Sequence, residues 1–162
     1  MEKNKTLKLA NAGMIAALYV VLTYIANLLG IASGTIQVRF SEALTILPVF
    51  TAAAIPGLTV GCVLANLLTG CAAWDVVFGS LATLIGAVGT RMLKNKPLLA
   101  WIPPVLSNAA IVPVVLIKVY GVPDAWWFLV LTVGAGEIIS CGLLGLLLWY
   151  YLKRIPMIKN ME

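Results

Sequence analysis

The residue of this chain that most needs a chemical explanation is Glu137, an acid in the middle of a long apolar segment. An ionisable group at mid-depth in a bilayer costs about 2.5–3.5 kcal/mol or more, so its presence asks for a reason. One interpretation is a protonated glutamate that is hydrogen-bonded inside a helix bundle. The other is ligand contact, because the adjacent Gly134 and Gly136 let a bound molecule approach the helix backbone closely.

Other polar side chains also fall within apolar segments or at their ends. Glu42 and Asp75 each begin a predicted helix, where an acid complements the helix dipole, so capping and ligand binding both remain open. Asn66 and Asn108 predict either hydrogen bonds between helices or ligand contacts. Trp74 fits an interfacial aromatic belt, and it also fits stacking on a planar ligand.

Membrane-spanning helices must position these residues. The 162 residues are 62% hydrophobic and 10% charged, against roughly 25% charged in soluble domains, so lipid must cover most of the surface. We predict one all-α transmembrane domain over residues 1–162, with helices near 9–30, 42–55, 57–70, 74–92, 98–118 and 126–152. The second and third are short for a crossing of about 20 residues, and the turn signal Pro56-Gly57 separates them.

The distribution of basic residues predicts the topology. Of 11 Lys and Arg residues, nine lie in three clusters: Lys3, Lys5, Lys8; Arg91, Lys94, Lys96; and Lys153, Arg154, Lys159. Six crossings put all three clusters on the cytoplasmic side with both termini, as the positive-inside rule favours. Because the clusters flank apolar segments, the net charge of +5 does not indicate nucleic-acid binding. Residues 31–41 then lie outside as a short extended segment, with Arg39 spaced to pair with Glu42.

The sequence lacks the residues that common catalytic and metal sites need. It has no histidine and no Walker A motif, and its three cysteines form no CxxC pair. We therefore expect no enzyme activity, no cofactor and no metal, but a binding or carrier protein without its own energy source.

Small residues recur at helical spacing on the first predicted helix. Ala12 with Ala16, and Gly13 with Ala17, form stripes that allow close approach between helices. The partner is either another helix of the bundle or a separate membrane subunit.

Three segments carry a resemblance to a known family. Gln-Val-Arg-Phe-Ser-Glu-Ala-Leu-Thr-Ile-Leu-Pro at 37–48, Ala-Ile-Pro-Gly at 54–57 and Asp-Val-Val-Phe-Gly-Ser-Leu-Ala-Thr at 75–83 resemble the QueT family. These are proposed substrate-binding (S) components of energy-coupling factor transporters for queuosine precursors. The resemblance implies a six-helix protein of a bacterial plasma membrane that captures its solute from outside. It also implies a transmembrane coupling subunit, which the stripe on the first helix would dock, and two ATPase subunits that hydrolyse ATP.

The resemblance also implies a binding site, with residues 31–41 closing over it. Its expected members are Gln37, Arg39, Phe40, Glu42, Asn66, Trp74, Asp75, Asn108 and Glu137. A carboxylate of Glu137 or Glu42 suits the adjacent N–H groups of a 7-deazaguanine, and Asp75 suits a cationic aminomethyl substituent. An S component for another vitamin, a proton-coupled carrier using Glu137 and a purely structural membrane subunit remain alternatives.

Overall fold

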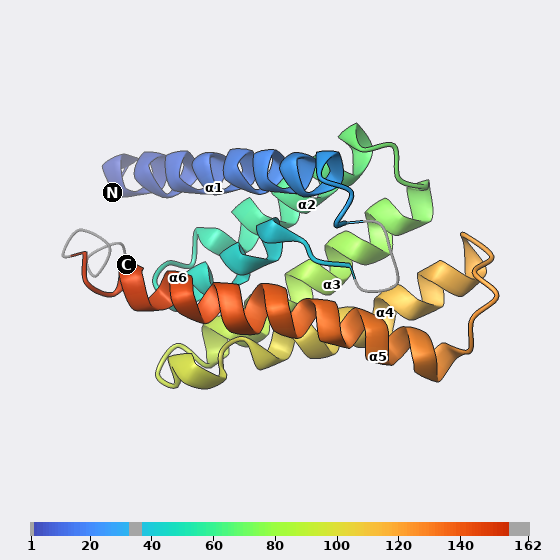
Figure 1. The fold of residues 1–162 in the computed structure, drawn as a ribbon. Helices are drawn as coiled ribbons and strands as arrows, with labels where there is room; N and C mark the ends of the chain where they lie inside the picture. Colours follow the sequence, from blue (N-terminus) through green and yellow to red (C-terminus); the bar gives the residue numbers. More distant parts are fainter. Residues whose placement is uncertain (1, 33–36, 156–162) are drawn as a thin grey trace.

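The computed structural model describes residues 2–32 and 37–155, and in these ranges the chain is a bundle of helices without strands (Figure 1). Its long helices are α1 (Glu2–Leu28), α3 (Ala73–Met92) and α4 (Ile102–Lys118), the last preceded by a single turn at Pro97–Leu99. A fourth long helix runs from Trp126 to Leu152. These four are long and apolar enough to cross a membrane, which confirms the predicted helical membrane bundle.

The last of these helices changes its winding at the bundle core. It consists of α5 (Trp126–Glu137), a π-helical segment η3 (Ile138–Leu144) and α6 (Gly145–Leu152). Short π-helical segments inside α-helices occur frequently at functional sites. Here the change falls directly after Glu137, the acid that the sequence singles out.

Two shorter elements lie among the long helices: η1 (Phe40–Val49), a 3₁₀ helix, and α2 (Ala54–Leu68). The sequence predicts an α-helix at 42–55, but the chain instead enters the bundle as an extended segment at 37–39 and continues as η1. Pro48 and Pro56 leave no room for one long helix here. Such a backbone is tolerated inside a membrane only when protein covers it, and η1 packs against α1, α3, η3 and α6.

The end of η1 is held by a side chain from α3. The Nη1 atom of Arg91 donates hydrogen bonds to the carbonyl oxygens of Pro48 at 3.0 Å and Val49 at 3.5 Å. The last carbonyl groups of a helix have no hydrogen-bond donor within that helix. The Arg91 guanidinium supplies the donor that these two carbonyl groups would otherwise lack.

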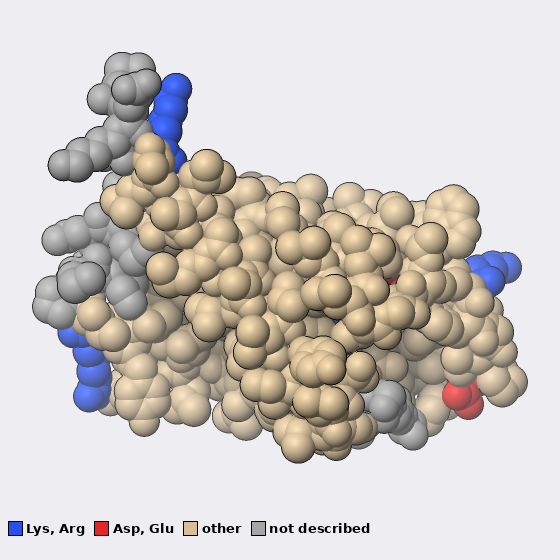
Figure 2. All heavy atoms as spheres, turned by 90° about the horizontal axis from the view of Figure 1, so that it is seen from above, with Lys and Arg blue, Asp and Glu red and all other residues tan. Residues whose placement is uncertain are grey.

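Charged side chains gather at the two ends of the bundle. On the face shown in Figure 2, an uncharged belt separates the Lys, Arg, Asp and Glu side chains at one end from those at the other. Figure 1 places the start of α1, the end of α6 and the loop between α3 and α4 at the same end. This end carries the predicted basic clusters as far as they are described, whereas Lys159 lies outside the described residues.

Close packing of α1 on α2 occupies part of the small-residue stripe. A Cβ added to Gly57 would lie 2.7 Å from the Ala12 carbonyl oxygen, and one added to Gly61 would lie 3.0 Å from the Ala16 Cα. Ala16 is accordingly buried, whereas Gly13 and Ala17 are exposed. The two stripes of the first helix thus separate: Ala12 and Ala16 pack inside the bundle, and Gly13 and Ala17 face outward.

Candidate functional site

A polar cavity of about 330 Å³ lies at the end of the bundle away from the chain termini. It is enclosed by the ends of α1, α2 and α4, the start of α3 and the extended segment 37–39. Its polar lining consists of Thr23, Asn27, Gln37, Arg39, Asn66, Thr69, Asp75 and Tyr120. The structure therefore brings together four of the predicted site residues, Gln37, Arg39, Asn66 and Asp75, which come from separate parts of the sequence.

The backbone of α5 and η3 positions the extended segment over the cavity. The Arg39 N–H donates to the Ser140 hydroxyl at 3.1 Å, and that hydroxyl donates to the Gly136 carbonyl at 2.9 Å. Gly136 is needed for this contact, since a Cβ there would lie 2.1 Å from the Gln37 carbonyl oxygen. The interpretation that Gly136 leaves room for a ligand is therefore wrong, because the chain's own backbone fills that space. Of the predicted extended segment at 31–41, residues 31–32 form a turn and 40–41 begin η1, so the prediction is wrong there, while 33–36 lie outside the described residues.

Asp75 is held at the cavity wall by a tyrosine. The Tyr120 hydroxyl donates to Asp75 Oδ2 at 2.9 Å and accepts the Ala72 N–H at 3.1 Å. Asp75 is 8% exposed and α3 has no side-chain cap, so the acid does more than cap the helix end. Partial burial, with the hydrogen bond to Asp75 in a smaller part, raises the pKa of Tyr120 to about 12. The sequence analysis missed Tyr120 because no spacing relates it to Asp75.

Glu42 and Glu137 form a buried carboxyl cluster next to the cavity. Glu42 is 1% exposed and accepts a hydrogen bond from the Tyr19 hydroxyl, while its Oε2 has no partner among the described residues. The predicted ion pair between Arg39 and Glu42 does not form. Glu42 lies in the first turn of η1, so its interaction with the helix dipole stays a prediction. Glu137 accepts a hydrogen bond from the Cys141 thiol at 3.2 Å.

The cluster follows directly in sequence on a residue that is hydrogen-bonded to the cavity wall. Thr23, which lines the cavity, donates to the hydroxyl of Ser41, the residue before Glu42, at 2.8 Å. One donor atom each of Glu42, Glu137 and Cys141 lies within 4.8 Å of the others, a spacing open to metal ligation. The Tyr19 hydroxyl donates to Glu42 and the Cys141 thiol donates to Glu137, so the cluster is a hydrogen-bonded network in which Glu42 Oε2 stays unpaired among the described residues.

The other predicted site residues do not line the polar cavity, and Asn108 lies beside Glu137 of the carboxyl cluster. Asn108 is 4% exposed, and its amide nitrogen has no partner in the part of the chain that is described. Phe40 is half-buried at the start of η1. Trp74 is 62% exposed and stacks on Phe78, with ring centroids 5.9 Å apart.

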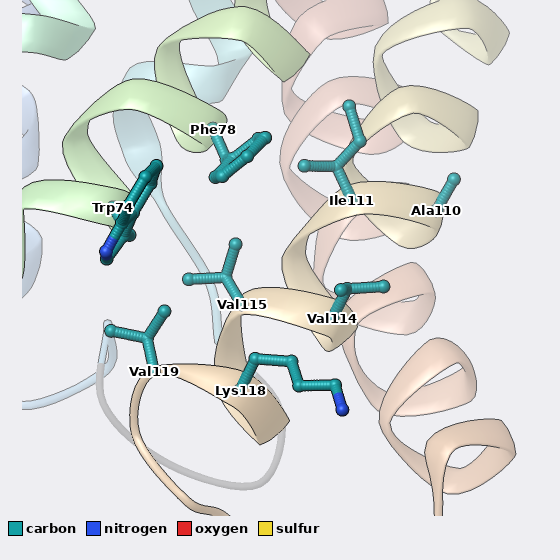
Figure 3. A pocket seen from close by; sticks show the side chains of 8 residues that line it. All are labelled: Trp74, Phe78, Ala110, Ile111, Val114, Val115, Lys118 and Val119. Carbon is teal, nitrogen blue, oxygen red and sulfur yellow. The ribbon is translucent and has the colours of Figure 1, made fainter.

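Trp74 belongs to a second, apolar hollow. This groove, of about 490 Å³, lies between α3 and α4, with Trp74 and Phe78 on one side and Val114 and Lys118 on the other (Figure 3). Its exposed apolar walls suit lipid contact, whereas a polar solute needs the donors and acceptors of the polar cavity. The structure therefore does not bring Trp74 together with Arg39, Asn66 and Asp75.

A helical membrane bundle with a polar cavity at one end indicates a membrane protein that binds a small solute. The sequence model of the QueT transporter family matches residues 9–154, and the chain belongs to this family. It is 40% identical over 86 residues to the Queuosine precursor transporter QueT of Lactococcus lactis subsp. cremoris (strain MG1363). That match covers 52% of this chain and 50% of the relative, so it spans about half the length of each protein. No solved structure matches the chain.

The family assignment confirms the resemblance drawn from residues 37–48, 54–57 and 75–83. It also confirms that the chain is a transport protein and not an enzyme.

Proposed function

We propose that the chain is the substrate-binding S component of an energy-coupling factor importer in a bacterial plasma membrane, and that it captures a queuosine precursor from outside. The observation that carries this proposal is the polar cavity at the end of the bundle opposite the basic clusters. With the clusters cytoplasmic by the positive-inside rule, the cavity faces the exterior. Segment 37–39 then covers a site that receives its solute from outside.

The cavity suits a small, flat, polar solute. Its volume of about 330 Å³ is at the lower end of small-molecule sites, which range over about 300–1,000 Å³. Arg39 and Asn66 supply hydrogen-bond donors for the ring carbonyl of a 7-deazaguanine. The carboxyl groups of Glu42 and Glu137 lie near enough to the Arg39 guanidinium to stabilise its positive charge.

Partner subunits supply the energy in this proposal. The chain has no Walker A motif, so ATP hydrolysis falls to two ATPases that act through a transmembrane coupling subunit. The outward-facing Gly13 and Ala17 on α1 support a docking face for that subunit, because small residues let helices approach closely.

Thermal unfolding of the detergent-solubilised protein with a panel of solutes tests the proposal. The panel contains queuine, 7-aminomethyl-7-deazaguanine, guanine and common vitamins. A ligand that binds only the folded state raises the unfolding midpoint, so we expect stabilisation by a deazaguanine and not by guanine. Stabilisation by another vitamin alone would retain the S-component class and replace the substrate, and no stabilisation of a folded sample would contradict a binding function.

A proton-coupled carrier is the second candidate, and buried Glu137 is the observation that favours it. Uptake into proteoliposomes separates the two. We expect no sustained accumulation by the isolated chain under a proton gradient, and ATP-dependent uptake once the coupling subunit and ATPases are added. Gradient-driven uptake by the isolated chain, lost in Glu137→Gln, would favour the carrier.

A further inference from the structure

The hydrogen bonds around Tyr120 determine which way its single proton points. The Ala72 N–H can only donate, so the Tyr120 oxygen must accept from it. The hydroxyl proton is then directed to Asp75 Oδ2, which acts as the acceptor. Because the pKa of Tyr120 lies near 12, the phenol keeps this proton at physiological pH. Tyr120 therefore holds one oxygen of Asp75, and among the described residues no cation forms an ion pair with the carboxylate.

The two charged side chains that line the cavity do not form an ion pair with each other. Among the described residues that line it, Arg39 and Asp75 carry the formal charges. Asp75 is 8% exposed, and its hydrogen-bond donor is the neutral Tyr120 hydroxyl. A nearly buried carboxylate without a cation is costly, so a ligand that brings a positive charge gains more here than a neutral one.

We propose that Asp75, positioned by Tyr120, forms the subsite for a protonated amine on the transported solute. The inference rests on the proposed function and deepens it, since it assigns the cationic class of substrate to that cavity. An aliphatic amine resembles the lysine side chain, with a pKa of about 10, and enters as an ammonium group. Asp75 accepts a charge-assisted hydrogen bond from it, while Tyr120 touches Asp75 and acts as a positioning residue.

Asp124 is the competing acid at the same end of the bundle. It is exposed and lines a smaller neighbouring cavity of about 190 Å³, which shares Gln37 with the polar cavity. Water solvates an exposed carboxylate, so its attraction for a ligand amine is weaker than that of Asp75. The Asp124→Asn variant is therefore the matched control for Asp75→Asn.

The test uses two ligands that differ in charge and little in size: 7-aminomethyl-7-deazaguanine and its neutral 7-hydroxymethyl analogue. Titration calorimetry on the detergent-solubilised chain gives both affinities for the wild type and for each variant. We expect the wild type to prefer the amine. Asp75→Asn keeps an oxygen for Tyr120 and should weaken amine binding about 10- to 100-fold, with less than about 3-fold change for the analogue. Asp124→Asn should leave both affinities nearly unchanged.

Tyr120→Phe tests the positioning role. It removes the hydroxyl and keeps the ring, so the preference for the amine over the analogue should fall about 3- to 10-fold. Tyr24→Phe, on the exposed face of α1, serves as its control. The selectivity ratio is the decisive measurement, because a merely structural loss would weaken both ligands alike.

The outcomes separate this inference from the proposed function. Equal binding of the two ligands by the wild type would overturn the ammonium subsite and leave the deazaguanine site standing. Loss of the preference in Asp124→Asn, with Asp75→Asn unaffected, would overturn the assignment to Asp75. Binding of neither ligand by folded protein would overturn the proposed function and the subsite with it.

Discussion

The carbonyl oxygen of Gln37 lies directly over Gly136, at a position where a Cβ on that glycine would be 2.1 Å away. Through this contact, the extended segment 37–39 packs directly against the helix that carries Glu137. Two residues nearly 100 positions apart in sequence are thus in contact, and a side chain at position 136 would displace the backbone at Gln37.

Replacing Gly136 by alanine should therefore destabilise the protein. The added methyl group overlaps a backbone atom that cannot rotate away, and such overpacking typically costs about 1–3 kcal/mol. Thermal unfolding in detergent measures the effect. Gly134→Ala is the control, because its Cβ would lie 3.9 Å from the Ala109 Cβ and the substitution should be neutral or favourable. Equal midpoints for the two variants would contradict the close contact.

The sequence predicted the long helices well and the site only in part. Composition and apolar length are enough to place α1, α3, α4 and the helix from Trp126 to Leu152. The sequence predicted the extended backbone at 37–39 but not the 3₁₀ helix that follows it, because such a helix depends on support from neighbouring helices.

The individual site residues divide in the same way. Arg39, Asn66 and Asp75 were identifiable as polar residues at membrane depth or at its edge, and they do line one cavity. The predicted stacking of Trp74 on a ligand in the cavity could not be judged from the sequence. Adjacent residues of a helix point in different directions, and Trp74 lines the apolar groove whereas Asp75 lines the cavity. Tyr120 and Thr23 could not be predicted, since their roles follow from tertiary contacts alone.

The bond between Tyr19 and Glu42 should show strong energetic coupling. Tyr19 is 1% exposed, so Tyr19→Phe leaves a buried carboxyl group without its donor, at a cost of about 1–3 kcal/mol. Chemical or thermal unfolding of Tyr19→Phe, Glu42→Leu, which removes the acceptor, and the double variant forms a double-mutant cycle. We expect a coupling energy of about 0.5–3 kcal/mol, and strictly additive effects would show that the bond contributes nothing.

Arg91 should stabilise the C-terminal end of η1, the short 3₁₀ helix inside the bundle. Arg91→Met removes the donors for the Pro48 and Val49 carbonyls and should lower stability by about 1.5–3 kcal/mol. The same substitution at Arg154, which is exposed and bonds the Tyr150 hydroxyl, should have a much smaller effect. A comparable loss of stability in both variants would point to a general effect of charge at this membrane surface.

The two faces of α1 should respond differently to enlargement. Ala16 packs against Gly61, so Ala16→Leu should destabilise the isolated chain and weaken ligand binding with it. Ala17 is exposed, and Ala17→Leu places its added atoms in lipid or detergent, where they fit without cost to the fold. If α1 docks the coupling subunit, Ala17→Leu should leave stability and ligand affinity unchanged while reducing co-purification with the coupling subunit and ATPases. Undiminished co-purification would remove this face of α1 from the interface, and unchanged stability of Ala16→Leu would contradict the close packing of α1 on α2.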